Sequence, residues 1–229
     1  MTCKTILKIC VLILFSITIG HGQSMTKEKD QNVFRPNLQD EKLWEFVNKT
    51  STVKIKEHNR NGIKLTSPNA LMVLKNYKFE EGSIEFDVKG RDVVQQSFPG
   101  IAFHIQNDSA CDVVYFRPFN FAPADTSRRH RAVQYISLPK FEWWYLREHF
   151  PLKYENKVNP VPKADEWFNA KVVIDGRKIR VFVNNSTLPS LEVEKLTDTK
   201  SGEIGLWDSG GEHESDANFA NLVIIPKKK

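Results

Sequence analysis

Hydrophobic and polar residues alternate with a period of two along most of this chain. Ile84, Phe86 and Val88 fall on one side of the segment that contains them. Glu85 and Asp87 fall on the other side. A period of two indicates β-strands that bury one face, whereas no window of helical length carries a 3.6-residue apolar stripe. The pattern therefore predicts a protein made mainly of β-strands.

Thirteen segments are predicted to be strands, and short runs of turn residues such as Asp175-Gly176 separate them. They are Leu43–Val47, Thr52–Glu57, Gly62–Thr66, Leu71–Lys75, Gly82–Lys89, Gly100–Gln106, Asp112–Arg117, Ala132–Ser137, Trp167–Asp175, Lys178–Asn184, Ser190–Lys195, Glu203–Asp208 and Asn218–Ile225. Closely spaced strands without internal repeats or linkers favour an all-β, single-domain antiparallel β-sandwich of the jelly-roll type.

Two interruptions break this pattern, Pro118–Arg131 and Leu138–Asp165. Loops of this length inside a compact domain usually have a function. The second segment is compatible with a short helix at Trp143–His149, and we expect it to fold back over one sheet and to wall a groove. It is rich in aromatic residues, namely Phe141, Trp143, Trp144, Tyr145, Phe150 and Tyr154.

The N-terminus has the features of a secretory signal peptide. Lys4 and Lys8 precede an apolar run, residues 9–19, which is too short to span a bilayer comfortably. Small residues follow at positions 20 and 22, which predicts cleavage before Gln23 and export to the periplasm or the medium; a membrane anchor is the alternative. We expect residues 1–22 to be the signal peptide, 23–36 a flexible lead-in, and 37–229 the β-sandwich domain.

Composition narrows the function classes. The chain has 229 residues, 40% of them hydrophobic, and a net charge of +5, which is too mild for a dense nucleic-acid-binding surface. Cys111 is the only cysteine after the predicted cleavage site, so no internal disulfide is expected. Its place in a strand favours a small buried hydrophobic residue over a nucleophile.

Several segments resemble the concanavalin A-like lectin/glucanase superfamily of jelly rolls, in particular its secreted bacterial branch of family-16-glycoside-hydrolase-like or 3-keto-disaccharide-hydrolase-like proteins. The resemblance covers about residues 40–226, is specific for fold, and implies carbohydrate as the ligand. The segments that carry it are Val114–Phe121, Arg128-Arg129, Ala132–Ser137, Trp167–Ile174, Ile179–Asn184, Gly202–Trp207 and Phe219–Leu222.

One feature of family 16 hydrolases is missing. The catalytic Glu-x-Asp-x-x-Glu pattern does not occur in the sequence. Because retaining glycoside hydrolysis needs two carboxylates about 5 Å apart, the sequence gives no support for that chemistry.

Candidate site residues lie on neighbouring predicted strands. If the polar sides of residues 101–106 and 113–117 adjoin, His104, Gln106, Tyr115 and Arg117 share one surface. A His, a Tyr and an Arg on an open sheet face suit the binding of an acidic sugar. Taken alone, His104 fits a hydrogen-bonded structural histidine slightly better, and it is the grouping with Arg117 that makes it a site candidate.

Further candidates lie in and after the basic cluster at positions 128–131. Arg128 and Arg129 can bind carboxylate or sulfate bidentately, although a solvated loop is the simpler interpretation for such a run. The candidate acids and bases are His104, Tyr135 and His130. The candidate substrate-binding residues are Tyr115, Arg117, Arg128, Arg129, Gln134, Trp143 and Trp144.

Some of these aromatic residues have an alternative role. Tyr135 is equally compatible with a core position. Trp143 and Trp144 either stack on a sugar ring or anchor their loop.

No metal or other cofactor is assigned. The acidic loop with Asp208, Glu212, Glu214 and Asp216 is compatible with a structural calcium, but its spacing matches no EF-hand, and a solvated acidic loop is the simpler interpretation. Motifs of metalloproteases, serine hydrolases and phosphate loops do not occur in the sequence.

These residues and the resemblance give three functional hypotheses. The first is an exported enzyme that acts by β-elimination, as a dehydratase or lyase, on uronic-acid-containing oligosaccharides, with or without sulfate, such as ulvan fragments. Arginine neutralises the uronate, Gln134 contacts the enolate, and His or Tyr moves the proton, so no acidic pair is needed. The alternatives are a 3-keto-glycoside-cleaving enzyme and a non-catalytic carbohydrate-binding module. The expected partner is an acidic oligosaccharide, with no nucleic acid or membrane, and the expected state is a monomer.

Overall fold

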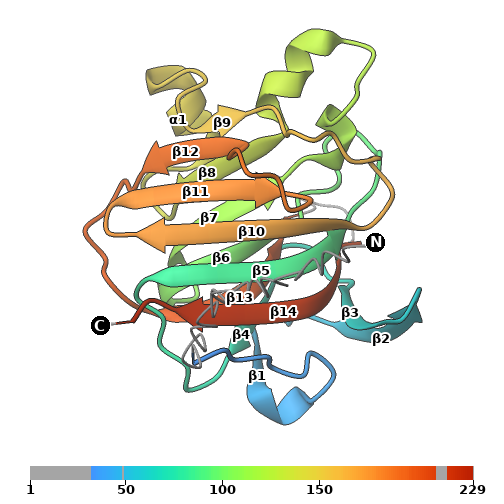
Figure 1. Cartoon of the computed structure of the whole chain (residues 1–229), viewed down its shortest axis with the longest axis vertical. Coiled ribbons are helices and arrows are strands. Elements are labelled where there is room, and N and C mark those ends of the chain that lie inside the picture. Colours follow the sequence, from blue (N-terminus) through green and yellow to red (C-terminus); the bar gives the residue numbers. More distant parts are fainter. Residues whose placement is uncertain (1–31, 48, 210–215, 229) are drawn as a thin grey trace, which may run out of the picture.

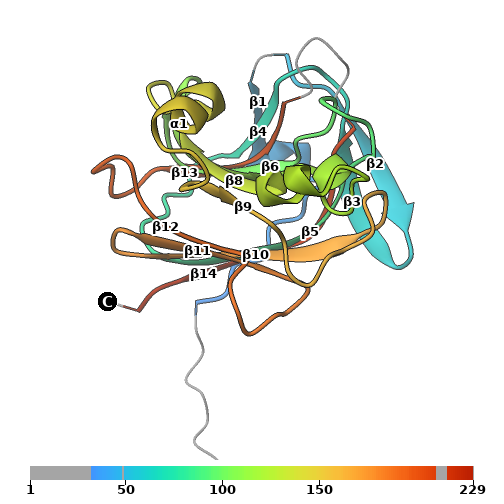
Figure 2. The same cartoon turned by 90° about the horizontal axis from the view of Figure 1, so that it is seen from above.

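Two antiparallel sheets of seven strands each lie face to face in the computed structural model of the chain (Figures 1 and 2). The structure describes residues 32–47, 49–209 and 216–228. This arrangement confirms the predicted all-β sandwich.

Sheet I carries the candidate site. Its strand order is β1 (Trp44–Val47), β4 (Ala70–Leu74), β13 (Glu203–Asp208), β6 (Gly100–Asn107), β7 (Ala110–Phe116), β8 (Val133–Ser137) and β9 (Glu155–Asn156). Sheet II packs behind it. Its order is β12 (Leu191–Glu194), β11 (Lys178–Val183), β10 (Phe168–Asp175), β5 (Gly82–Lys89), β14 (Asn218–Pro226), β3 (Arg60–Leu65) and β2 (Thr52–Glu57).

All thirteen predicted strands overlap strands of the structure. The strand that the pattern did not predict is β9, whose two residues are too few to show an alternation. The helical elements are η1 (Glu41–Leu43), η2 (Pro118–Asn120), η3 (Thr126–Arg131) and α1 (Trp143–His149). The last of these is the short helix with which the sequence is compatible, and it stands beside the β8–β9 end of sheet I, away from sheet II (Figure 2).

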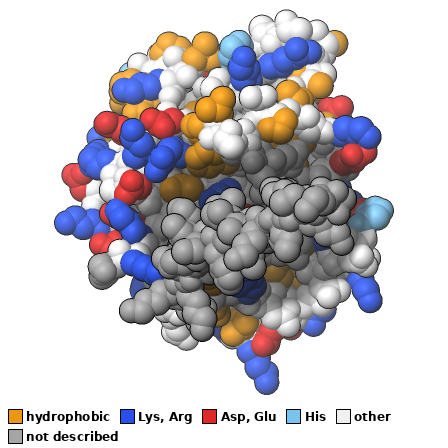
Figure 3. Space-filling model, viewed as in Figure 1, with side chains coloured by type: hydrophobic (Ala, Val, Ile, Leu, Met, Phe, Trp, Pro, Cys, Tyr) orange, Lys and Arg blue, Asp and Glu red, His pale blue; other side chains and the backbone are white. Residues whose placement is uncertain are grey.

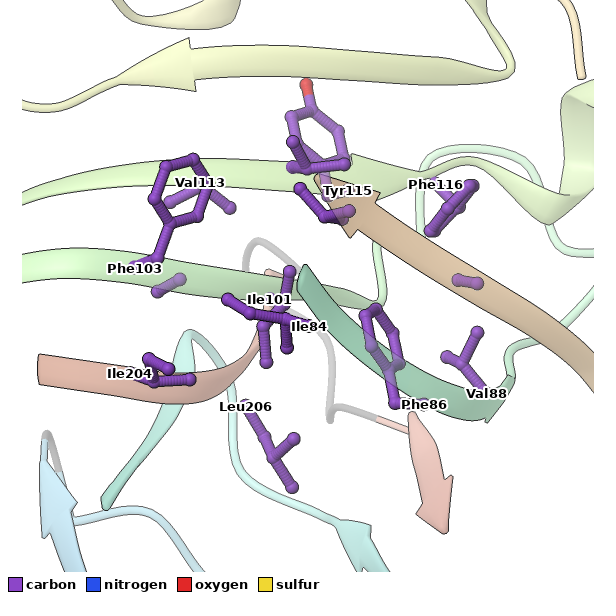
Figure 4. Packing of buried hydrophobic residues seen from close by; sticks show 14 of the residues in the cluster. Ile84, Phe86, Val88, Ile101, Phe103, Val113, Tyr115, Phe116, Ile204 and Leu206 are labelled. Atoms are coloured by element: carbon purple, nitrogen blue, oxygen red, sulfur yellow. The ribbon is translucent and has the colours of Figure 1, made fainter. Parts of the chain in front are cut away.

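The core lies between the two sheets, where the inward residues of each strand interdigitate. The stripe of Ile84, Phe86 and Val88 on β5 is fully buried and faces residues of sheet I (Figure 4). The rings of Phe116 and Phe168 meet across the sheets at 5.0 Å between centroids. Burying one such side chain contributes roughly 1.5–3 kcal/mol, so this layer is the main source of stability.

The sandwich begins before the predicted boundary. Phe34 forms a β-bridge with Ile224, with backbone hydrogen bonds of 2.8 Å in both directions. Its ring also stacks on Tyr77 at 4.9 Å. Phe34 therefore belongs to the folded domain and not to the lead-in predicted for residues 23–36. The local sequence does not predict this, because the partners of Phe34 lie far away along the chain.

The predicted signal peptide, residues 1–22, lies outside the described residues. None of the helices in the described ranges is long and apolar enough to cross a membrane. On the face seen in Figure 3, Lys and Arg side chains lie next to Asp and Glu around the rim, so the described surface there carries both signs of charge.

Candidate functional site

A cleft of about 920 Å³ opens on the outer face of sheet I. Its size is that of a pocket for a small organic ligand. The apolar part of its wall comes from Phe98, Cys111, Tyr115, Ile136 and Trp207. The long interrupted segment also contributes to the wall, as predicted, through Leu138, Glu142, Trp143 and Arg147.

The alternation of β7 determines which residues reach the cleft. Cys111 and Tyr115 line it, and Arg117 continues the same face just after the strand. Phe116 points the other way, into the contact with sheet II. Since β7 is central in sheet I, the Tyr115 and Arg117 side chains are fixed by the sheet.

Tyr115, Arg117 and Gln134 form a buried hydrogen-bonded group in this wall. The Tyr115 hydroxyl donates to Gln134 Oε1 at 2.8 Å and accepts from Arg117 Nη2 at 2.6 Å. Arg117 Nη2 also donates to Gln134 Oε1. Burial raises the pKa of Tyr115 against the opposing effect of the Arg117 charge, and burial lowers the pKa of Arg117. Tyr115 is therefore a neutral phenol at neutral pH, next to a cation that favours negative charge nearby.

Glu155 is the one carboxylate in ion-pair distance of the cleft arginines among the described residues. It is 3% exposed. Its Oε2 lies 3.0 Å from Arg147 Nη2 and 3.5 Å from Arg117 Nη1, and its Oε1 lies 3.7 Å from Arg131 Nε. One buried anion thus holds three guanidinium groups together.

Arg128 belongs to the same group of arginines without contacting Glu155. Its Nε donates to Asn120 Oδ1 at 3.0 Å, and the Asn120 amide donates to the Arg131 carbonyl oxygen at 3.0 Å. Its guanidinium lies 5.7 Å from the centre of the Phe119 ring. We call Arg117, Arg128, Arg131 and Arg147, all of which line the cleft, the arginine cluster.

The shared surface predicted for His104 and Arg117 is wrong. His104 has a positive φ of 50°, and the β6–β7 register shifts between Phe103 and Asn107. The local break in alternation lets the ring meet Asp112, with Nδ1 at 3.1 Å from Oδ2, while Nε2 lies 2.8 Å from the Glu80 carbonyl oxygen. His104 is 1% exposed and does not line the cleft, so it has no route to a ligand there.

Tyr135 occupies the core position that the sequence left open as its alternative. Its hydroxyl donates to Asp112 Oδ1 at 2.8 Å and accepts from the Leu196 amide at 3.2 Å. The residue has no exposed surface. Burial and the Asp112 charge raise its pKa far above the usual range, so it is a structural phenol and not an acid or base of the cleft.

The other predicted site residues divide between the cleft and the open surface. Trp143 lines the cleft, is 47% exposed and has the Arg147 guanidinium 5.0 Å from its ring centre. Trp144, Arg129 and His130 are exposed but do not line the cleft. Gln134 lies beneath the wall and reaches it only through Tyr115 and Arg117.

The sequence analysis missed Glu155, Arg147, Phe98 and Trp207. Glu155 and Arg147 lie in the aromatic-rich segment, where neither a motif nor a periodicity distinguishes them from solvated charges. Trp207 gave a weak signal, because an aromatic residue stands on the polar side of its strand. Its ring lies 5.3 Å from that of Tyr115.

No group of three or more metal-binding side chains exists in the described part of the chain. Asp216 of the acidic loop forms ion pairs with Lys64 and Arg91, and Asp208 accepts the Phe98 amide at 3.0 Å. Both carboxylates therefore have protein partners. Glu212 and Glu214, the remaining acids of the predicted calcium alternative, lie outside the described residues.

The sandwich with its cleft on the outer sheet face is typical of the concanavalin A-like, glucanase-like superfamily. Carbohydrate-binding module CBM66 from Bacillus subtilis has a similar structure, with a TM-score of 0.57, 12% identity, and coverage of 80% of this chain and 95% of that one. A Bacteroides ovatus family 16 glycoside hydrolase from a mixed-linkage glucan system, solved with a product, has a TM-score of 0.52, 11% identity, and coverage of 84% and 99%. At these identities the similarity shows the fold alone.

The family follows from a sequence model. The chain belongs to the 3-keto-alpha-glucoside-1,2-lyase-like domain family, whose model matches residues 34–225. A search of curated protein sequences gives no match. The protein is thus a carbohydrate-active enzyme or binding module of this family.

Proposed function

We propose that the chain binds a glycoside in the cleft of sheet I and cleaves 3-keto-glycosides by β-elimination. The observation that carries the proposal is the buried Arg117, which stacks on Tyr115 beside an aromatic wall. The aromatic rings suit the apolar face of a sugar, and the Arg117 guanidinium suits the negative charge of an enolate. The family description, which names a 3-keto-glucoside lyase, supports the same chemistry.

The reaction needs a base and an oxyanion-stabilising group. The ketone at C3 acidifies the C2–H bond, so a base takes that proton and leaves an enolate. The enolate electron pair then forms a C1–C2 double bond as the glycosidic C1–O bond breaks, and the aglycone leaves with a proton. Arg117 and Tyr115 are placed to stabilise the enolate oxygen.

Glu142 is our candidate for the base. It is half-buried, lines the cleft next to Trp143 and accepts a hydrogen bond from Trp144 Nε1 through its Oε2 at 3.0 Å. Its Oε1 is left for a substrate. The candidates predicted from sequence, His104, Tyr135 and His130, do not line the cleft, and Cys111 has its pKa raised to about 12 by burial.

The test uses 4-nitrophenyl 3-keto-α-D-glucopyranoside and, as a matched substrate, the same glucoside with a C3 hydroxyl. We expect release of nitrophenol from the keto compound only, above the rate without protein, and a slower rate with deuterium at C2. Glu142→Gln lowers kcat roughly 100-fold or more if Glu142 is the base, while Glu166→Gln, an exposed control, leaves it unchanged. Equal rates on both substrates, or no rate above background, would contradict the proposal.

Elimination on a uronate, the first hypothesis from sequence, uses the same chemistry with a carboxylate in place of the ketone. A second arm of the experiment therefore follows the ultraviolet absorbance and product masses of uronate-ended oligosaccharides, including sulfated ones. Absorbance that rises in this arm and not with the keto-glucoside would move the proposal to the acidic sugar.

A non-catalytic binding module is a second candidate. The observation that favours it is that no histidine lines the cleft among the described residues. A binding module keeps its affinity for a glycoside in Glu142→Gln and shows no turnover with any substrate of the panel. Calorimetry on the wild type and Trp143→Ala then measures how much the stacking residue contributes.

A further inference from the structure

The arginine cluster has more positive charge than its protein partners neutralise. Three of its members share the single carboxylate of Glu155. Arg128 forms no ion pair within 4 Å in the described part of the chain and donates only to neutral oxygens. Asp108, Asp125 and Glu142 also line the cleft, but none of them forms an ion pair within 4 Å of these arginines among the described residues. Within ion-pair distance, the four guanidinium groups therefore have one carboxylate, that of Glu155.

The cluster also has unused hydrogen-bond donors. Arg131 reaches Glu155 only through Nε, at 3.7 Å, and 44% of its side chain is exposed. Arg147 uses Nε and Nη2 on Glu155 and is 28% exposed. Arg128 uses Nε and Nη2 on two neutral oxygens, those of Asn120 and Phe119. An oxygen-rich anion in the cleft would match this surplus of donors.

The protein holds these groups in place before any ligand arrives. Arg117 is 5% exposed, stacks at 4.8 Å on the Tyr115 ring and donates to the Arg131 carbonyl oxygen at 3.1 Å. Glu155 lies on β9 and connects α1, η3 and the end of β7 through its arginines. Preorganised guanidinium groups lose little conformational entropy on binding a planar oxyanion bidentately.

We propose that Arg128, Arg131 and Arg147 form a recognition site for an oxyanion, a carboxylate or a sulfate, on the glycoside. The inference rests on the proposed function in that the ligand is a sugar in this cleft, and it adds that the sugar is acidic. Arg117, which is fixed deeper in the wall, remains for the reacting part of the sugar.

The test uses three sets of ligands that differ only at C6. They are the 4-nitrophenyl α- and β-glycosides of glucose, of glucuronic acid and of glucose 6-sulfate, whose affinities are measured by calorimetry. We expect at least one acidic glycoside to bind about tenfold or more tightly than its glucose counterpart. Raising NaCl from about 0.05 to about 0.5 M should weaken only the acidic ligand markedly. A carboxylate site favours the glucuronide and a sulfate site the 6-sulfate.

Substitutions locate the site. Arg131→Gln should reduce the preference for the acidic glycoside about fivefold or more and leave glucose-glycoside binding unchanged, because its terminal nitrogens contact no other group that is needed for folding. Arg128→Gln is a second variant with the same expectation. Arg177→Gln, an exposed arginine that pairs with Asp198 outside the cleft, is the matched control and should change neither affinity.

The outcomes separate this inference from the proposed function. Equal affinities for the three ligands at both salt concentrations, no binding by any of them, or an unchanged preference in both arginine variants would overturn the oxyanion site. Such a result would leave the proposed elimination reaction untouched, since that reaction is tested separately by turnover of the keto-glucoside. Conversely, an acidic preference that disappears in Arg131→Gln, without turnover of any substrate, would support the site and contradict the elimination reaction.

Discussion

Replacing Glu155 by glutamine tests whether one buried carboxylate holds the arginine cluster together. The substitution keeps the shape of the side chain and removes its charge, so Arg117, which is 5% exposed, loses its only ion-pair partner in the described part of the chain. Removing one partner of a buried pair costs about 3–5 kcal/mol. The ion pairs of Arg131 and Arg147 add little to this cost, because the two side chains are 44% and 28% exposed and water screens their charges. The new amide oxygen still accepts a hydrogen bond, which keeps the cost near the lower end of this range. We therefore expect Glu155→Gln to lower the free energy of unfolding by about 3 kcal/mol.

For a domain of this size, about 3 kcal/mol corresponds to a fall in Tm of roughly 6–12 °C. Thermal and urea unfolding followed by circular dichroism measure both quantities. Glu166→Gln is the control, since Glu166 pairs with Lys163 at the exposed surface and its loss should cost under about 0.5 kcal/mol. Adding Arg147→Gln to Glu155→Gln should recover part of the loss, because it removes one of the unbalanced charges. A fall in stability no larger than that of the control would refute the reasoning.

Three further predictions concern the wall and the core. His104→Ala should lower the free energy of unfolding in urea by about 2–4 kcal/mol, because it removes a hydrogen-bonding partner of the buried Asp112. The folded variant should keep its affinity for the sugar, and lost affinity at unchanged stability would contradict a structural role for His104. Burial raises the pKa of Cys111 from 9.0 to about 12, so at pH 8 it should react with Ellman's reagent about 1000-fold more slowly in the folded protein than in urea. Similar rates in the two states would contradict its burial. Gly202→Ala should destabilise the folded protein by about 2 kcal/mol or more, since the new Cβ would lie 2.3 Å from the His104 carbonyl carbon. Wild-type stability in this variant would show that the irregular backbone around His104 can move.

The strands could be predicted because their alternation is a local property. Each residue of a regular strand turns to the opposite face from its neighbour, so Val172 and Ile174 on β10 and their partners Val181 and Ile179 on β11 indicate one buried face without any knowledge of the fold. The same reasoning correctly brought Tyr115 and Arg117 to one surface. A separate observation, the length and aromatic content of the second interruption, predicted that this segment walls the cleft.

The reasoning failed where the backbone leaves the regular strand conformation. A single residue with positive φ at His104 changes which face its side chain meets, and no residue type in this stretch signals the change, since the position is not a glycine. Tyr135 follows the alternation of β8, but the face that it joins depends on which side of sheet I packs against sheet II. Glu155 could not be found, because its importance comes from three arginines on different elements, of which Arg117 is 38 residues away in the sequence.

The position of Glu155 bears on how the cleft can respond to a ligand. It is the only described carboxylate to which η3, α1 and the end of β7 are all linked by ion pairs, so these three walls share one counter-ion. A second anion that enters the cleft would lessen the repulsion among the guanidinium groups, and each arginine would then need Glu155 less. Binding of an acidic sugar should therefore stabilise the fold more in Glu155→Gln than in the wild type. That difference in the ligand-induced rise in Tm would measure the coupling between the buried carboxylate and the proposed oxyanion site.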